Sequence, residues 1–404
     1  MPILGLIVEY NPFHLGHQHH LDAAKRLTRP EATIAVMSGC FTQRGEPAIT
    51  DKWSRAQMAL RQGIDLVVEL PVAWAVRSAP YFAEGATRLL AELGATDVCF
   101  GSESGDLRTL DQVARLLLQE PQTFKQELKA GLDQGLSFAA AQDRALQRAA
   151  PELPAGVFAS PNNTLGIHYL MSIQQHGLAL QAHTIPRTTS YNDAMPQAAL
   201  PSAKAVRLQL LQGEDPTGLP PAAASTLKQS IATGRAPISW EDFSLPMLYR
   251  LRQLSPEQLE LYPETGEGLG IRLHQAARQT NRLQELWKLA KTRRFTFTRL
   301  QRLLTYVLLD IRQHDLQQIQ DWLPPPYIRV LAMNTAKQAV RSLLAKAKLP
   351  VIFSAGRSDL SQPRANRCLQ LDIAASDCYT LAFRQDSRSG LDYTVPVITE
   401  KSLR

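Results

Sequence analysis

Two histidines three residues apart, with a glycine between them, are the residues of this chain best suited to chemistry. His14 and His17 lie in the segment Gly5–His20, which reads GLIVEYNPFHLGHQHH. Residues three apart share one face of a helix, so both imidazoles can be aimed at one group. Their N–H groups can donate hydrogen bonds to phosphate oxygens, and Gly16 lets a phosphate approach the backbone. The spacing predicts a site for phosphoryl chemistry, with His14 and His17 as its catalytic residues.

The position of the histidines in the predicted fold supports this interpretation. H-x-G-H alone is an unspecific pattern, and the alternative is that both histidines merely cap and pack a helix. Ile3–Glu9 is a short apolar run typical of a strand, and Gly16–Leu27 predicts the helix that follows it. A helix N-terminus placed after the first strand of a parallel sheet offers free N–H groups and the positive end of a dipole. This context favours a phosphate site.

Strands and helices alternate through the first half of the chain. Further strands are predicted at Ala32–Met37, Ile64–Leu70, Thr96–Phe100 and Leu178–Ile185. Further helices are predicted at Asp51–Arg61, Tyr81–Leu93, Thr164–His176 and Ala198–Leu211. Buried strands that alternate with helices form βαβ units. The predicted fold class is therefore α/β, a Rossmann-like doubly wound parallel sheet, in which ligands bind beyond the carboxyl ends of the strands.

A stretch rich in proline and glycine divides the chain into two predicted domains. Residues 213–221 read GEDPTGLPP and break the alternating pattern. Residues 1–212 are expected to form the catalytic domain, with a helical insertion at about 107–150. Residues 222–404 predict a mostly helical C-terminal domain, in which the apolar segment Leu300–Ile311 should be buried.

Charge is distributed unevenly between these two halves. The net charge is +7, yet 26 basic and 16 acidic residues follow position 215, whereas 18 and 21 precede it. A basic half favours a polyanionic partner, and nucleic acid is the obvious candidate. The alternative is a solvated basic surface without a partner.

One basic segment of the second half also carries aromatic residues. Lys288–Arg302 reads KLAKTRRFTFTRLQR, and Phe295 and Phe297 lie among its cations. Cations that neutralise phosphates and aromatics that stack on bases are the ingredients of single-stranded RNA contact. The predicted RNA-binding residues are Lys288, Lys291, Arg293, Arg294, Arg299 and Arg302. The alternative is the start of an amphipathic helix, with core phenylalanines and solvated arginines.

The remaining composition points to a cytoplasmic protein that does not enter a membrane. The four cysteines form no C-x-x-C pair, so neither a zinc ribbon nor a disulfide scaffold is expected. No run approaches the roughly 20 apolar residues that cross a bilayer, and no signal peptide is predicted. No metal site built from protein side chains is predicted.

The motifs together resemble a known family. H-x-G-H after a first strand is similar to the signature of the nucleotidyltransferase and class I aminoacyl-tRNA synthetase superfamily. The segments EYNPFHLGHQHH, SGCFTQRGEPAITDKWSRAQMAL, IDLVVELP, FGSE, SPNNTLGIHYL and KTRRFTFTRLQRLL resemble the bacterial tRNA(Met) cytidine acetate ligases. The resemblance implies that ATP and acetate form acetyl-adenylate, whose acetyl group passes to N4 of the wobble cytidine of elongator tRNA(Met). Mg²⁺ is expected to screen the triphosphate.

The resemblance also implies which residues bind ATP. They are Ile7, Val8, Glu9, Tyr10, Asn11, Pro12, Phe13, His14, Leu15, Gly16, His17, Gln18, His19, His20, Gly101, Asn162 and Arg187. Without the resemblance, Gly101 could be an ordinary turn glycine, and Arg187 a partner in a surface salt bridge. Asn162 could be a helix N-cap, and we prefer it to Asn163 as the nucleotide contact.

Two further segments could contact pyrophosphate, acetate or cytidine, but their motifs do not specify which residues do so. Ser202–Arg207 reads SAKAVR where the superfamily usually has Ser-Ser-Thr-x-Ile-Arg, and only its first and last residues match clearly. Lys204 could still place a positive charge near the leaving pyrophosphate. Gln43, Arg44 and Glu46 lie in a predicted loop at the same sheet edge, where they would hold acetate or cytidine, or simply order a turn.

Two other functions stay open at this point. An adenylyltransferase acting on a small phosphorylated metabolite would use the same H-x-G-H site, but it would not need the basic second half. A non-catalytic RNA-binding protein could keep a degenerate nucleotide fold, although the intact H-x-G-H argues against this.

Overall fold

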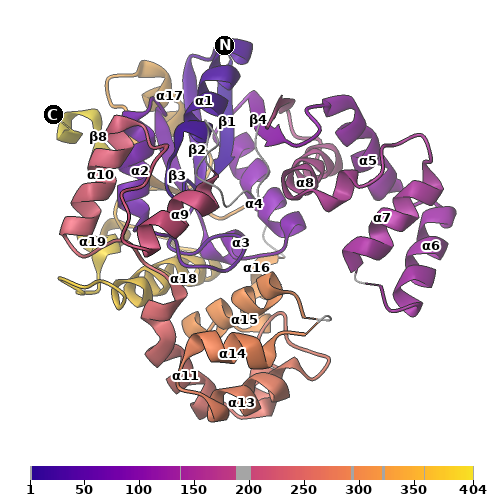
Figure 1. Cartoon of the computed structure of the whole chain (residues 1–404). Helices are drawn as coiled ribbons and strands as arrows, with labels where there is room; N and C mark the ends of the chain where they lie inside the picture. Colours follow the sequence, from indigo (N-terminus) through magenta and orange to yellow (C-terminus); the bar gives the residue numbers. More distant parts are fainter. Residues whose placement is uncertain are drawn as a thin grey trace.

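A computed structural model describes residues 2–136, 138–187, 202–292, 295–320, 324–358 and 360–403. These residues form one eight-stranded sheet (Figure 1). Its strands are β1 (Ile3–Val8), β2 (Ala32–Ser38), β3 (Leu66–Leu70), β4 (Asp97–Ser102), β5 (Gln181–Pro186), β6 (Ile328–Met333), β7 (Val351–Ile352) and β8 (Ile398–Thr399). The strand order is β5-β4-β1-β2-β3-β6-β7, and β8 pairs with β6.

The helices fall into two groups along the chain, those of the first half and those of the second half. In the first half they are α1 (Leu15–Thr28), α2 (Lys52–Arg61), α3 (Val72–Ala75), α4 (Ala79–Glu92), α5 (Leu107–Gln119), α6 (Gln122–Asp133), α7 (Phe138–Ala149), α8 (Pro161–Gln175) and α9 (Ala203–Leu211). In the second half they are α10 (Pro221–Ala232), α11 (Ser244–Gln253), α12 (Pro256–Leu259), α13 (Leu269–Gln279), α14 (Leu283–Ala290), α15 (Phe297–Leu309), α16 (Gln313–Gln320), α17 (Gln338–Lys346), α18 (Pro363–Thr380) and α19 (Leu391–Thr394).

The first five strands have the order of a dinucleotide-binding fold. They run β3-β2-β1-β4-β5, and every neighbouring pair among them is parallel. From β1 the chain adds β2 and β3 on one side and then returns to add β4 and β5 on the other side. This switch in strand order opens a crevice between β1 and β4, at the carboxyl ends of the strands. The predicted α/β doubly wound sheet is confirmed. The start of the helix expected at Ala198–Leu211 lies outside the described residues, and α9 covers the rest.

The central strands of the sheet are buried on both faces, as is typical of parallel strands. Ile34 and Val36 of β2 face one apolar cluster, and the alternate residues Ala35 and Met37 face the other. Helix α4 packs on the first side and helices α1 and α2 pack on the second. Asp51 caps α2 as expected, because its side chain accepts a hydrogen bond from Ser54 N at 2.8 Å.

The end of the chain returns to the same sheet. Strand β6 lies antiparallel beside β3, so the sheet is not confined to residues before the expected boundary at 213–221. A buried ion-pair cluster joins the end of the chain to its first half: Lys52 Nζ lies 2.7 Å from Glu69 Oε2 and 2.9 Å from Asp392 Oδ1. The sequence analysis assigned no strand to residues 328–399, because β6 pairs with β3 and β8 pairs with β6 across long stretches of chain.

Two helical groups stand beside the sheet. Helices α5 to α7, within the predicted insertion at about 107–150, extend to the right in Figure 1. Helices α11 to α15 form the group drawn in orange below the sheet, and Leu300 to Leu309 of α15 are mostly buried, as predicted. None of the described helices combines the length and apolar character needed to span a membrane.

Candidate active site

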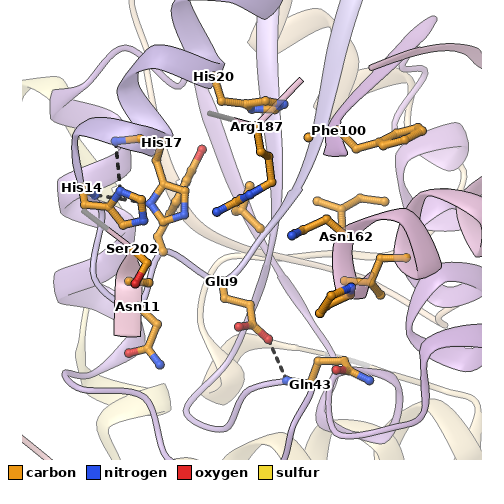
Figure 2. Close-up of a pocket in the computed structure, with 18 of the residues that line it drawn as sticks. Glu9, Asn11, His14, His17, His20, Gln43, Phe100, Asn162, Arg187 and Ser202 are labelled. Atoms are coloured by element: carbon orange, nitrogen blue, oxygen red, sulfur yellow. Dashed lines mark hydrogen bonds between the residues drawn. The ribbon is translucent and has the colours of Figure 1, made fainter. Parts of the chain in front are cut away.

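A cavity of about 400 Å³ opens at the carboxyl ends of β1, β4 and β5, where the switch in strand order places it (Figure 2). Volumes of this order accommodate small-molecule ligands. Residues from the β1–α1 turn, from the start of α8 and from the start of α9 line it. The fold therefore gathers segments about 150 to 190 residues apart in the chain around one cavity.

The two histidines are held by the backbone of their own helix. His14 is the N-cap of α1, and its Nδ1 accepts a hydrogen bond from Gly16 N at 3.0 Å. Nδ1 of His17 accepts in turn from His14 N at 3.3 Å. Because both Nδ1 atoms are acceptors, each neutral ring carries its proton on Nε2. This reciprocal capping leaves an N–H donor on each ring for a ligand.

Burial keeps the histidines of the turn uncharged. Burial, followed by the charges of Arg187 and Arg207, lowers the pKa of His14 to about 3. The pKa of His17 also lies well below its ordinary value, chiefly through burial and then through His14. The pKa of His20 falls to about 4 for the same first reason. At neutral pH these rings are therefore neutral hydrogen-bond donors, and the fixed positive charges come from arginines.

Gly16 is required by the packing of the two rings. Their centroids lie 3.8 Å apart, and the His14 ring covers the backbone of Gly16. A Cβ atom at position 16 would lie 2.7 Å from His14 Cε1, closer than carbon atoms approach. Glycine thus permits the capping arrangement as well as the approach of a ligand.

The opposite side of the cavity is built on a carboxylate after β4. Asn162 Nδ2 donates to Glu103 Oε1 at 2.6 Å, and Asn163 N donates to Glu103 Oε2 at 2.8 Å. Asn163 is buried, and its side-chain oxygen accepts from Glu103 N at 2.9 Å. Asn162 lines the cavity, whereas Asn163 braces the turn behind it.

Gly101 and Arg187 meet across two neighbouring strands. Gly101 pairs with Ile185 in β5, and Arg187 follows directly after that strand. A Cβ atom on Gly101 would lie 3.3 Å from Arg187 Cγ, so glycine gives the arginine room to cross the sheet edge. Figure 2 shows the Arg187 side chain between the histidines and Asn162.

The start of α9 adds positive charge on the histidine side. Lys204 and Arg207 line the cavity, and Ser202 caps the helix by accepting from Ala205 N at 3.2 Å. Arg207 Nη1 donates to Asn11 O at 3.1 Å, which fixes the arginine against the β1–α1 turn. The degenerate SAKAVR segment thus still brings two cations to the cavity.

A turn after β2 closes the lower end of the cavity in Figure 2. Gln43 N donates to Glu9 Oε1 at 2.8 Å, and Gln43 Nε2 donates to Arg77 O at 2.6 Å. Burial raises the pKa of Glu9, and the hydrogen bond from Gln43 opposes this. Arg44 also lines the cavity, whereas Glu46 pairs with Arg207 at 3.4 Å.

Most predicted ATP-binding residues line the cavity, but four do not: Pro12, Phe13, Leu15 and Gln18. Phe13 is fully buried in the core beneath the turn, and Gln18 faces away to donate to Asp22. A contiguous segment cannot aim every side chain at one ligand. Residues that the sequence analysis did not select also line the cavity: Ala79, Phe82, Cys99, Phe100, Pro161, Thr164, Leu165, Tyr169, Ile185, Pro186, Ala203 and Thr298. Most are apolar and look like ordinary core residues in the sequence.

The predicted RNA-binding residues fall into different environments. Lys288 and Lys291 are exposed, and Lys288 pairs with Glu285 on the surface. Arg302 is buried, and its Nε donates to Glu264 Oε1 at 2.6 Å. Arg299 donates to two backbone oxygens, of Glu264 at 2.9 Å and of Thr265 at 3.0 Å. Arg293 and Arg294 lie outside the described residues.

The two aromatics of this segment also differ. Phe295 is buried, and Phe297 is exposed, with its ring centroid 4.9 Å from that of Trp287. Phe295 is therefore a core residue, as the alternative interpretation expected, whereas Arg302 is buried and ion-paired and is not solvated. Lys288, Lys291 and Phe297 keep the exposure that an RNA contact requires.

The fold and the H-x-G-H turn at its switch point define a nucleotidyltransferase. The family model described as HIGH Nucleotidyl Transferase matches residues 1–392. A tRNA(Met) cytidine acetate ligase of Thermoanaerobacter sp. (strain X514) is 40% identical over 407 residues, which cover 98% of this chain and 100% of the relative. That of Acetivibrio thermocellus is 36% identical over 414 residues, with the same coverage. The chain belongs to the tRNA(Met) cytidine acetate ligase family of HIGH nucleotidyl transferases.

Solved structures agree with this assignment. Apo Thermotoga maritima TmcAL superposes with a TM-score of 0.93 at 34% identity and covers 99% of both chains. The same protein bound with alpha-thio ATP superposes with a TM-score of 0.91 at 33% identity, again over 99% of both chains. The similarity extends over the whole chain, the helical groups included.

Proposed function

We propose that this protein uses ATP to activate acetate and transfers the acetyl group to N4 of the wobble cytidine of elongator tRNA(Met), giving N4-acetylcytidine. The names of its relatives support the substrate, and the neighbour bound with alpha-thio ATP supports the nucleotide. The observation that carries the proposal is the reciprocal capping of His14 and His17, which leaves an Nε2–H donor on each of these two cavity-lining rings.

In the first step, an acetate oxygen attacks the α-phosphorus of ATP and pyrophosphate leaves. Negative charge grows on the phosphate oxygens, where the neutral donors of His14 and His17 stabilise it. Arg187, Lys204 and Arg207 line the same cavity and supply positive charge there. No covalent enzyme intermediate is needed, since positioning and electrostatics can supply the rate enhancement.

We propose that Mg²⁺ accompanies the triphosphate of ATP. Among the described residues no group of three or more His, Cys, Asp or Glu side chains is placed to hold a metal ion. Mg²⁺ commonly keeps several waters and binds through substrate phosphates. Its ligands would then be phosphate oxygens and water, and its contribution would be to neutralise charge on the leaving pyrophosphate.

We propose further that tRNA contacts the second half of the chain, residues 222–404, whose basic excess and exposed Lys288 and Lys291 suit phosphates. Residues 1–212 would supply the ATP-binding catalytic part. The buried Arg302 is better explained as a structural residue. With tRNA as the acceptor, the expected compartment is the cytoplasm.

The test is incubation with ATP, Mg²⁺, labelled acetate and unmodified elongator tRNA(Met), followed by nucleoside analysis. The proposal predicts label in N4-acetylcytidine, AMP as the nucleotide product, and loss of label when ATP is omitted. An AMP-bearing small molecule without labelled RNA would instead support an adenylyltransferase. RNA binding without ATP binding would support a non-catalytic protein.

A further inference from the structure

We propose that Glu9 receives the cytidine: its free carboxylate oxygen accepts a hydrogen bond from the N4 amine and takes the proton that this amine loses as the amide forms. This inference rests on the proposed function and assigns the second half-reaction to the end of the cavity opposite the nucleotide residues. Glu9 was expected only as part of the segment that contacts ATP.

The position of Glu9 suits an acceptor better than it suits a phosphate. Glu9 follows β1, and Figure 2 shows its carboxylate below the histidines and Arg187, pointing toward Gln43. An anionic carboxylate repels phosphate, whereas it attracts an amine that donates hydrogen bonds. Carboxylates accept from the N4 amine of cytosine in nucleic-acid recognition for this reason.

One oxygen of this carboxylate is fixed and the other is available. Oε1 accepts from Gln43 N at 2.8 Å, and among the described residues Oε2 accepts no hydrogen bond. The side chain is only partly buried, because it faces the cavity. Gln43 in turn is anchored on Arg77 O. The carboxylate is therefore held in one orientation while Oε2 remains open to a ligand.

The α14–α15 segment, proposed above to contact tRNA, adjoins this end of the cavity. Thr305 Oγ1 of α15 donates to Gly45 O, and Tyr306 of the same helix donates to Val76 O. Thr298, in the first turn of α15, lines the cavity together with Gln43. A base carried by an RNA on the α14–α15 side would therefore enter next to Glu9, without crossing the histidine end.

The chemistry of the step balances without any further reagent. The lone pair of cytidine N4 attacks the carbonyl carbon of acetyl-adenylate, so that a C–N bond forms. The C–O bond to the phosphoryl group breaks and AMP leaves with that electron pair. One N4 proton moves to Glu9 Oε2 and is released to water after the product departs. Burial raises the pKa of Glu9, which makes the carboxylate a better proton acceptor than an exposed one.

The decisive variant is Glu9→Gln, whose Oε1 can still accept from Gln43 N. Two rates are measured: acetate-dependent ATP–pyrophosphate exchange, which reports adenylate formation, and acetyl transfer from supplied acetyl-adenylate to tRNA. We expect exchange within about twofold of the parent and transfer slower by about 100-fold, the range of general base catalysis. Glu9→Asp should recover part of the transfer rate. Glu84→Gln, which alters the partner of His176 outside the cavity, should change neither rate.

The pH profile separates a base from a structural anchor. In the parent, the transfer rate should fall as pH drops through the raised pKa of Glu9, because the protonated acid cannot accept the proton. This acidic limb should be absent in Glu9→Gln. Transfer at the parental rate in Glu9→Gln, or equal losses in exchange and transfer, would overturn the inference. Absence of acetyl transfer in the parent itself would instead contradict the proposed function.

Discussion

The β1–α1 turn and the α14–α15 segment were both singled out for side chains that bind anions, and the fold treats them differently. At the turn, Nδ1 of His14 and Nδ1 of His17 each accept a hydrogen bond from the backbone at the helix start, and the Nε2–H of each ring is left for a ligand. In α15, the guanidinium of Arg302 pairs with Glu264 inside the protein. A polar residue indicates a ligand site only if the fold leaves one of its hydrogen-bonding groups unpaired. Local capping leaves such a donor unpaired, whereas a long-range ion pair inside the protein can occupy it.

The largest effect should come from breaking the first of these two regions. His17→Ala removes one donor to the developing charge, so acetate-dependent ATP–pyrophosphate exchange should fall about 10²- to 10³-fold. Stability should fall by only about 1 kcal/mol, the cost of a helix cap. His274→Ala is the matched control, since His274 bonds Leu254 O far from the cavity. Exchange at the parental rate in His17→Ala would refute the assigned role.

The second region is tested by Arg302→Ala. Glu264 would lose its partly buried partner, so the free energy of unfolding should fall by about 2 kcal/mol. Denaturant unfolding measures this. A variant with parental stability but weaker tRNA binding would show that Arg302 contacts RNA after all.

A pH experiment separates the buried histidines from the arginines, which stay charged throughout. The folded pKa of His14 is about 3, below the ordinary value of about 6.5. The unfolded chain therefore binds a proton that the folded chain excludes, and this contribution to stability is complete above about pH 6.5 and is lost as pH falls toward 3. The stability difference between the parent and His14→Ala should shrink by about 1 kcal/mol from pH 7.5 to 5.5. A constant difference would mean that His14 titrates normally.

The smallest effect is expected at the exposed lysines. Lys288→Ala combined with Lys291→Ala should raise the KM for tRNA several-fold and reduce the magnitude of the salt dependence by about 1.4 in log–log slope, the value for two phosphate contacts on a single strand. Stability should change by less than about 0.5 kcal/mol, because the Lys288–Glu285 pair is exposed. An unchanged KM would move the RNA surface away from α14.

The sequence predicted those parts of the fold that depend on local patterns. Strands β1 to β5 and the helices between them follow from short apolar runs, caps such as Asp51 and stops such as Gly94. Strand β6 was missed because its place in the sheet depends on antiparallel pairing with β3, more than 250 residues away in the chain. The burial of Arg302 likewise depends on Glu264 in a distant loop.

The candidate site was predictable to the same extent. His14, Gly16 and His17 occupy one turn, and their roles follow from spacing. Phe100 and Tyr169 resemble core residues in the sequence, and only the folded chain shows that they also line the cavity. The availability of Glu9 Oε2 depends on the backbone of Gln43, which no motif reveals.

We propose that the H-x-G-H turn serves adenylate formation and is not needed for transfer to RNA. The direct test compares His17→Ala under two conditions: ATP with acetate, and supplied acetyl-adenylate, each with unmodified elongator tRNA(Met). We expect almost no N4-acetylcytidine in the first condition and a rate within a few-fold of the parent in the second. Equal failure in both conditions would contradict the account.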